Sequence, residues 1–258
     1  AKTITIGARN FLDILRALPE GCEVSLGMQE KRLQIKSAKS RFSLQTLPAE
    51  DFPRLSAAEG TPTKFAVPQK LLRSLIGLVQ YAMAQQDIRY YLNGLLMVVE
   101  EGQLKLIATD GHRLAYALKS VGDKSLSRQE VILPRKTVIE LAKLLAENDD
   151  PVAIELSATQ ASFKFGEVLL VSKLVDGKFP DYTRVVPENQ PRRLRLDRNE
   201  LLQSLQRAAI LTSDKFKGVR WVLSDGTLKI ICSNTEQEEA KEELDVDYKG
   251  ESLDIGFN

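Results

Sequence analysis

The chain has 258 residues, a formal net charge of +1 at pH 7 and 43% hydrophobic residues, which allows buried cores and excludes a bulk electrostatic attraction to nucleic acid or membranes. No run of about 18 apolar residues occurs and no secretory leader opens the sequence, so we expect no membrane partner. Cys22 and Cys232 match no metal-binding or redox spacing, which favours a reducing cytoplasm.

Hydrophobic periodicity predicts short strands in regular alternation with a few helices. Helices are predicted at 8–18, 68–83, 134–147 and 197–211. Strands are predicted at 2–6, 22–28, 31–37, 41–46, 63–67, 94–100, 103–109, 113–119, 129–133, 151–156, 160–165, 168–174, 218–224, 227–233 and 238–247. This pattern is dominated by antiparallel hairpins and predicts an α+β fold.

The sequence repeats itself. Residues 94–107 and 218–231 match at an offset of 124, and each segment reads as strand, tight turn and strand. Each turn is an acidic residue followed by glycine, at 101–102 and 225–226, a pair that two-residue hairpin loops accept. A repeat of about domain length predicts one small domain that is used several times.

The helices belong to the same repeat. Residues 68–75 match 198–205 at an offset of 130, and residues 8–15 match 134–141 at an offset of 126. The chain therefore contains four units of one helix plus antiparallel strands, of two alternating kinds. One complete pair of units spans about 63–186. One single unit precedes this pair and one follows it. A duplicated domain would begin and end on complete pairs of units, so we expect a chain that is cut at both ends.

Each predicted helix separates apolar from polar residues. The apolar sides comprise Leu12, Leu15 and Leu18; Leu71, Leu75, Leu78, Val79 and Ala82; Val138, Leu141 and Leu145; and Leu201, Leu205 and Ala208. The polar sides comprise Arg9, Asp13 and Arg16; Lys70, Arg73, Ser74, Gly77 and Gln80; Lys136, Glu140 and Lys143; and Arg198, Gln203, Gln206 and Arg207. Taken singly, these are ordinary amphipathic helices with solvated faces. Taken together, four equivalent faces of this kind suit a phosphate backbone.

Three motifs are more specific, at 83–94, 109–115 and 172–187. Together with Pro-Arg-Lys at 134–136 and the closing Ile-Gly-Phe-Asn at 255–258, they closely resemble the bacterial replicative sliding clamp, the β subunit of DNA polymerase III. The resemblance covers the whole chain in collinear order. It implies head-to-tail homodimers of full-length subunits, each with three similar domains, that close into a ring around duplex DNA. Helices line the central channel and sheets form the outside.

The same resemblance implies a domain map and a function. Residues 1–62 would be the second half of domain one, 63–187 a complete domain two, and 188–258 the first half of domain three. The chain would be a non-catalytic processivity factor without metal or cofactor, cytoplasmic and associated with the nucleoid during replication. Its partners would be double-stranded DNA, the polymerase III catalytic subunit, the clamp loader and other proteins with a clamp-binding motif.

The resemblance also implies a pocket for a partner peptide. Its residues are Leu92, Thr109, Gly111, His112, Arg113, Leu114, Pro180, Arg184 and Val185. An apolar floor with an arginine rim suits a short peptide with Leu or Phe anchors and one polar group. Without the resemblance, His112 reads as a structural histidine in a turn, since no nucleophile or metal-ligand cluster accompanies it. A core role also remains open for Leu92 and Val185.

By the same resemblance the candidate DNA contacts are Arg9, Gln86, Tyr90, Tyr91, Arg135 and Lys136. Adjacent tyrosines in a strand would face opposite sides, with one in the core, whereas in a protruding loop both could reach DNA. For the two cations of the third helix, generic surface charge is an equal alternative. An acidic run is predicted to be an outward strand face that keeps DNA off the exterior. It comprises Glu236, Glu238, Glu239, Glu242 and Glu243.

Two other functions compete with the clamp. A metal-dependent nuclease would need clustered carboxylates or histidines, and only the separated Asp110 and Asp176 are available. A peptide-binding scaffold that never encircles DNA would keep the pocket but bind circular and linear DNA alike.

Overall fold

The computed structural model describes residues 3–53, 60–122, 125–212 and 217–258. Residue 2 of the first predicted strand falls outside this range, and so do residues 54–59, which precede the predicted domain boundary at 62/63. The chain forms two compact units, Ala1–Phe179 and Pro180–Asn258. Among the described helices, none is long and apolar enough to span a membrane.

All four predicted helices are confirmed. They are α1 (Ala8–Ala17), α2 (Gln69–Val79), α3 (Arg135–Leu144) and α4 (Arg198–Ala208). The 3₁₀ turns η2 (Gln80–Ala82) and η5 (Ala209–Leu211) extend α2 and α4 to about the predicted ends. Asp197 begins α4 by accepting hydrogen bonds from the backbone N–H groups of Asn199 and Glu200, at 2.8 and 3.0 Å.

The predicted strands are also present, and one further strand, β16, was not predicted. The strands are β1 (Ile4–Ile6), β2 (Ser25–Gln29), β3 (Arg32–Ser37), β4 (Ser40–Pro48), β5 (Thr63–Pro68), β6 (Gly94–Glu100), β7 (Gln103–Thr109), β8 (Leu114–Ser120), β9 (Gln129–Pro134), β10 (Pro151–Leu156), β11 (Gln160–Phe165), β12 (Val168–Lys173), β13 (Val219–Ser224), β14 (Thr227–Ser233), β15 (Glu239–Asp245) and β16 (Leu253–Phe257). They form four-stranded antiparallel sheets in the orders β1-β4-β3-β2, β12-β11-β10-β5, β8-β7-β6-β9 and β15-β14-β13-β16.

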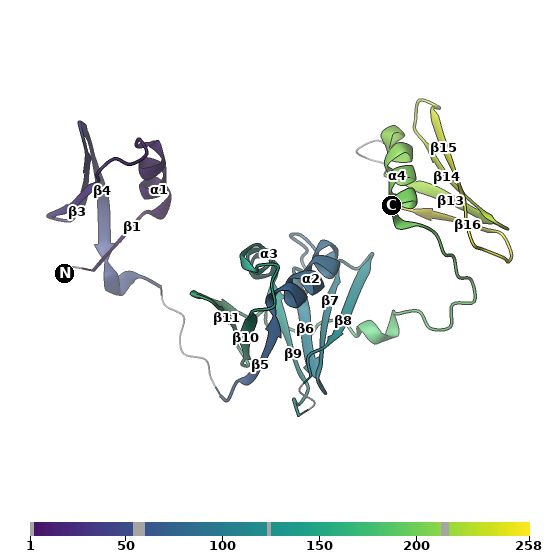
Figure 1. Ribbon diagram of the computed structural model, residues 1–258, viewed down its shortest axis with the longest axis horizontal. Helices are drawn as coiled ribbons and strands as arrows, with labels where there is room; N and C mark the ends of the chain where they lie inside the picture. The colour runs from purple at the N-terminus through teal and green to yellow at the C-terminus, as the bar shows by residue number, and fades with distance from the viewer. Residues whose placement is uncertain (1–2, 54–59, 123–124, 213–216) are drawn as a thin grey trace. The chain divides into compact units, whose positions relative to one another are not determined.

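The two sheets of the central part exchange their first strands. β5 begins the helix-plus-strands unit of α2 but pairs with β10 of the unit of α3. β9 begins the unit of α3 but pairs with β6 of the unit of α2. Helices α2 and α3 lie side by side and are in contact (Figure 1). One continuous core joins both helices to both sheets, and its fully buried side chains include Leu72, Leu75, Leu141, Ile154 and Phe163.

Two helix faces differ from the prediction. In α2 the buried stripe is Leu72, Leu75, Ile76 and Val79, at the i, i+3, i+4, i+7 spacing, whereas Leu78 is 57% exposed. In α1 no residue is buried. Leu12 and Leu15 are exposed there, while Phe11, Ile14 and Leu18 are half-buried. In α2 the predicted Leu75, Val79 and Ala82 are buried as expected, so its face differs only in part. In α1 the half-buried Phe11 and Ile14 lie one position from the predicted Leu12 and Leu15. Two apolar stripes compete in each sequence.

The acidic run is only partly an outward face. In β15 exposed residues alternate with half-buried ones, and Glu242 is half-buried. Its carboxylate accepts a 2.9 Å hydrogen bond from Nε of Arg207 on α4 and forms an ion pair with that guanidinium. The hydrogen bond from Arg207 lowers the pKa of Glu242. The prediction of an outward Glu242 is therefore wrong, whereas Arg207 is exposed as predicted and its ion pair with Glu242 fastens α4 to its sheet.

Candidate peptide and DNA-contact site

A closed loop follows α2 in the central part of the chain, and we call residues 84–93 the 84–93 loop. The N–H of Ala84 donates to the carbonyl of Leu92 at 3.0 Å and closes the loop at its base. Inside it, the Asn93 side chain accepts from the Asp87 N–H at 2.9 Å and donates to the Asp87 carbonyl at 2.8 Å. Gln86 has a φ of 57°, in the left-handed region. The loop is thus fixed by its own hydrogen bonds.

The two tyrosines of this loop lie in a 3₁₀ turn, η3 (Tyr90–Leu92), and not in a strand. Tyr90 is 58% exposed, Tyr91 is half-buried, and their rings meet edge to face at 5.8 Å. A Cβ at Gly177 would lie 3.5 Å from the Tyr90 ring. The arrangement leaves polar and aromatic groups of Tyr90 and the neighbouring exposed Gln86 available to a ligand. Leu92 is 1% exposed, so it fits the alternative core role.

The 84–93 loop is tied to the start of α3. The N–H of Arg135 donates to the carbonyl of Asn93 at 3.0 Å, and its guanidinium donates to the carbonyl of Met83 at 3.2 Å. Arg135 is half-buried, while Lys136 is exposed beside it. The candidate DNA contacts of the loop and of α3 are therefore neighbours. Arg9 is exposed on α1, in the N-terminal part of the chain.

The second part of the site is the 109–114 turn, residues 109–114 between β7 and β8. The Asp110 carboxylate accepts hydrogen bonds from the backbone N–H groups of His112 and Arg113, at 2.9 and 3.0 Å, and from Nε of Arg113 at 3.0 Å. Burial raises the pKa of Asp110, but these hydrogen bonds outweigh it and hold the pKa below its ordinary value. The Thr109 hydroxyl donates to the Arg113 carbonyl at 2.7 Å. Asp110 is thus ionised and organises the turn.

The candidate pocket residues of this turn differ in exposure. His112 and Arg113 are exposed, Leu114 is half-buried, and Thr109 is 9% exposed. The Arg113 guanidinium lies over the exposed Tyr81 ring, 5.5 Å from its centroid. Together with Tyr81 of η2, the turn therefore offers an aromatic and cationic surface beside the half-buried Leu114.

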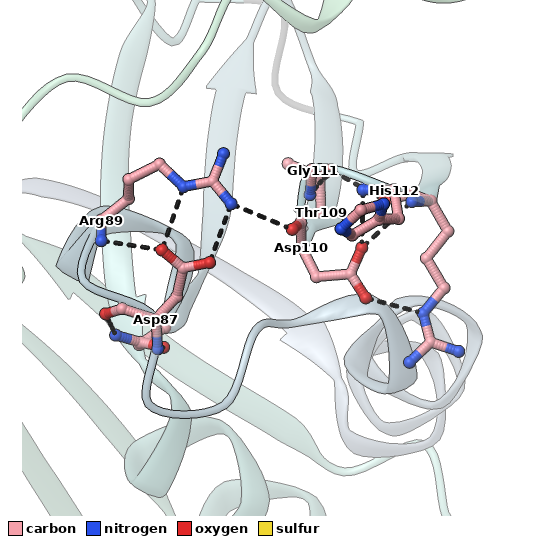
Figure 2. Close-up of polar contacts among 8 residues, drawn as sticks. Asp87, Arg89, Thr109, Asp110, Gly111 and His112 are labelled. Carbon is pink, nitrogen blue, oxygen red and sulfur yellow. Dashed lines mark hydrogen bonds and ion pairs between the residues drawn. The ribbon is translucent and has the colours of Figure 1, made fainter. Parts of the chain in front are cut away.

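Arg89 connects the loop with the turn, as Figure 2 shows. Its Nε and Nη2 donate to the two carboxylate oxygens of Asp87 at 3.0 and 2.8 Å, and Nη2 also donates to the Asp110 carbonyl at 3.3 Å. The hydrogen bond from Arg89 lowers the pKa of Asp87 from 3.8 to about 2. Sequence reasoning missed both residues, although their i, i+2 spacing within the 83–94 motif was a signal for a local ion pair.

The remaining pocket candidates belong to the second compact unit. Asp181 starts the 3₁₀ turn η4 (Tyr182–Arg184) and forms a 3.0 Å ion pair with Arg184, whose side chain is 84% exposed. Pro180 is exposed, and Val185 is 64% exposed, which does not fit a core role. An exposed proline, valine and arginine within six residues form a second small apolar surface with a cationic neighbour.

Two lysines of the helix faces are paired with neighbouring carboxylates. Nζ of Lys70 lies 2.7 Å from the Asp149 carboxylate, and Nζ of Lys143 lies 3.0 Å from that of Glu140. Both pairs are largely exposed, and exposed ion pairs contribute little to stability. They can therefore exchange a carboxylate for a phosphate at low cost. Across the described ranges, no group of three or more His, Cys, Asp or Glu side chains could hold a metal ion.

The architecture defines a class of protein built from repeated modules, each with one helix and a four-stranded antiparallel sheet. Three family models match in order: the DNA polymerase III beta subunit N-terminal domain at residues 1–56, its central domain at 66–181, and its C-terminal domain at 183–258. The chain is 46% identical to the beta sliding clamp of Escherichia coli K12 over 254 residues, which is 98% of this chain and 69% of that protein.

Solved structures agree with the sequence relatives. A DNA polymerase III subunit beta structure from Pseudomonas aeruginosa matches with a TM-score of 0.91 and 46% identity, covering 99% of this chain and 70% of that one. A clamp from Bartonella birtlesii, described as bound to griselimycin, matches with a TM-score of 0.89 and 38% identity over 100% and 70% of the two chains. The chain belongs to the DNA polymerase III beta subunit family, the sliding clamps. Its function is that of a DNA polymerase processivity factor.

Proposed function

We propose that this chain, within a full-length subunit, forms a head-to-tail homodimeric ring around duplex DNA and has no catalytic activity of its own. The collinear match to sliding clamps over 98% of the chain carries the proposal. The weak ion pairs on the exposed faces of α2 and α3 support it, because contacts of this strength allow sliding. The ring holds DNA by enclosure, with the helices towards the channel and the sheets outside.

The domain map belongs to the same proposal. Residues 1–62 represent part of a first clamp domain, 63–187 a complete second domain, and 188–258 part of a third. The strand exchange in the central part supports treating 63–187 as one complete domain, because each of its sheets takes strands from both units. Since a processivity factor acts on replicating DNA, the protein works in the bacterial cytoplasm and associates with the nucleoid during replication.

The pocket and its partners are the finer part of the proposal. The exposed Val185 and half-buried Leu114, with Arg113 and Arg184 nearby in sequence, supply the chemistry for a peptide with Leu or Phe anchors and one polar group. The polymerase III catalytic subunit, the clamp loader and other proteins with such a motif bind there in turn. Tethering raises the concentration of the polymerase at the primer end. We also propose that griselimycin, named in relatives' structures, binds this chain.

Topological retention tests the ring. The full-length subunit is loaded onto a nicked circular DNA by its clamp loader, and the bound fraction is followed at high salt before and after the circle is cut. We expect loss of protein only after cutting. Salt-sensitive loss whether or not the circle is cut would support the peptide-binding scaffold instead.

A peptide titration tests the pocket. Replacing Leu114 and Val185 with Asp should abolish binding of a labelled peptide with Leu and Phe anchors, measured by fluorescence polarisation. Leu118→Asp is the matched control, because Leu118 is 40% exposed on the same strand but outside the pocket. Unchanged affinity in the double variant would remove the pocket assignment.

A DNA titration tests the loop. The double variant Tyr90→Ala with Tyr91→Ala should weaken DNA contact, measured by duplex anisotropy, and leave the peptide affinity unchanged. Unfolding of this variant would assign the tyrosines to the core.

A further inference from the structure

We infer that Arg89 couples the DNA-contact loop to the peptide-contact turn, so that DNA at the 84–93 loop changes the shape and affinity of the 109–114 turn. The inference rests on the proposed function for the identity of the two ligands. What it adds is a positioning residue between them and an energetic link between the two binding events. All the contacts that support this link lie within the central part of the chain.

The first step is the attachment of Arg89 to the DNA-contact residues. Its carbonyl accepts from the Leu92 N–H at 2.8 Å, and the carbonyl of the next residue, Tyr90, accepts from the Asn93 N–H at 3.0 Å. Its own N–H donates to the Asp87 carboxylate at 2.8 Å. The backbone of Arg89 therefore moves with the segment that carries Tyr90. A ligand that shifts the backbone at Tyr90 therefore shifts Arg89 as well.

The second step is the contact of the guanidinium with the turn. Nη2 donates to the Asp110 carbonyl at 3.3 Å while it holds the Asp87 carboxylate at 2.8 Å, so one nitrogen joins two segments 23 residues apart in the sequence (Figure 2). Gly111 lies directly against the same group. Its φ is +89°, and a Cβ there would lie 3.0 Å from Nη2 of Arg89. The turn is thus packed on the guanidinium with no side chain between them.

The third step is the spread of a displacement within the turn. Asp110 is the residue whose carboxylate orders the backbone of His112 and both the backbone and side chain of Arg113. A shift of the Asp110 peptide therefore reorients the exposed His112 and Arg113, which are two residues of the candidate pocket. Because binding coupling is reciprocal, a peptide at the turn changes the affinity for DNA by the same factor.

Arginine suits this role better than lysine would. A planar guanidinium can hold a carboxylate through two nitrogens and still present a further N–H to a carbonyl, whereas an ammonium is a single point charge. Arg128 provides a matched control elsewhere on the central domain. It is also an exposed arginine held by two carboxylates, Glu100 and Glu130, but it contacts neither the loop nor the turn.

The histidine resonance provides a direct test, because His112 is the only histidine in the chain. The Hε1 proton signal of His112 is followed by NMR while a short DNA duplex is added, with duplex binding measured separately by anisotropy. In the wild-type chain and in Arg128→Ala the signal should move. In Arg89→Ala it should stay in place although the duplex still binds. Movement that persists in Arg89→Ala would be a direct effect of DNA on His112 and would overturn the inference.

A second readout measures the coupling itself. The Kd of the labelled peptide should change at least about fivefold between duplex-free and duplex-saturated wild type, in the range usual for coupled sites, and by less than about twofold in Arg89→Ala. Arg89→Lys should give an intermediate change and replaces Arg89→Ala if that variant does not fold. If both ligands bind the wild type without affecting each other, the inference is wrong while the proposed function stands. If the duplex or the peptide does not bind the wild type, the corresponding part of the proposed function fails and the coupling fails with it.

Discussion

Helices α1 and α3 occupy equivalent places in the repeat but are held very differently. Leu15 of α1 corresponds to Leu141 of α3 at the offset of 126. Leu141 is fully buried, whereas Leu15 is 38% exposed and α1 buries no residue at all. The two helices have similar apolar patterns, so the difference comes from what they pack against. In the central part, α3 shares its core with a second helix and with two sheets that exchange strands.

The strands show the same contrast. β9 leaves its own unit and pairs with β6 of the neighbouring one, whereas its equivalent β1 pairs with β4 of its own unit. In the N-terminal module only Leu33, Ile35 and Ser37 are buried among the described residues. Burial of this kind of module therefore depends on a partner module, and sequence patterning alone does not supply it.

The largest expected effect separates the two leucines. Leu141→Ala should cost about 2–5 kcal/mol, because it opens a cavity in a closed core. Leu15→Ala should cost less than about 0.5 kcal/mol, since its side chain is already partly in water. Native-state hydrogen exchange in urea, followed separately for peptides from α3 and α1, measures both losses. Equal losses would mean that α1 is packed as tightly as α3.

A second, smaller effect tests the exchanged strand pairing. Gly94 begins β6, and a Cβ there would lie 2.5 Å from the carbonyl oxygen of Leu133 on β9. The backbone of β9 cannot move away from this Cβ without breaking its pairing with β6. Gly94→Ala should therefore destabilise the central domain by about 1–3 kcal/mol. At the repeat-equivalent Gly218, the nearest atom would be the carbonyl oxygen of Phe257 at 3.8 Å.

Gly218→Ala is therefore the matched control. An alanine fits at that distance, and its lower unfolded-state entropy offsets small losses, so its effect should stay within about 0.5 kcal/mol. Hydrogen exchange of peptides from β9 and β16 measures the two variants. A larger loss for Gly218→Ala than for Gly94→Ala would contradict the difference in packing between the two pairings.

Much of this fold could be predicted from the sequence, because periodicity and repeat offsets act locally. The helices and hairpins follow from apolar spacing and from turns such as Glu101-Gly102. β16 was missed although Leu253, Ile255 and Phe257 alternate as in a strand, and projecting β9 forward by 124 residues places a strand there. The choice between two apolar stripes on α2, which exposed Leu78, depends on tertiary packing that the repeat does not encode.

The candidate site was predicted less completely than the fold. Motif resemblance selected residues such as Gly111 and Tyr90, and the structure places them on segments that a hydrogen bond from Arg89 joins. The motif resemblance could not select Arg89, because its contact with the Asp110 carbonyl joins two loops that are distant in sequence. Hydrogen bonds to backbone carbonyls leave no pattern of residue types, so networks of this kind become visible only in three dimensions.

The smallest expected effect concerns α4, which is held to its sheet partly by a polar contact where α3 is held by apolar ones. The hydrogen bond from Arg207 lowers the pKa of Glu242 below its ordinary 4.5. A carboxyl group with a lowered folded-state pKa stabilises the fold above its unfolded-state pKa, and this contribution is lost as the pH falls through the folded-state value. The stability difference between the wild type and Arg207→Gln should therefore be constant above about pH 5 and shrink below the unfolded-state pKa of about 4.5.

Arg198→Gln makes the same charge change on the same helix and serves as the control, because the Arg198 guanidinium donates to the Asn199 side chain instead of Glu242. Its stability should run parallel to that of the wild type as the pH falls. Urea denaturation monitored by fluorescence of Trp221, the only tryptophan in the chain, reports on this unit directly. A pH-independent difference for Arg207→Gln would mean that Arg207 stabilises α4 by packing alone, and α4 would then be held as α3 is.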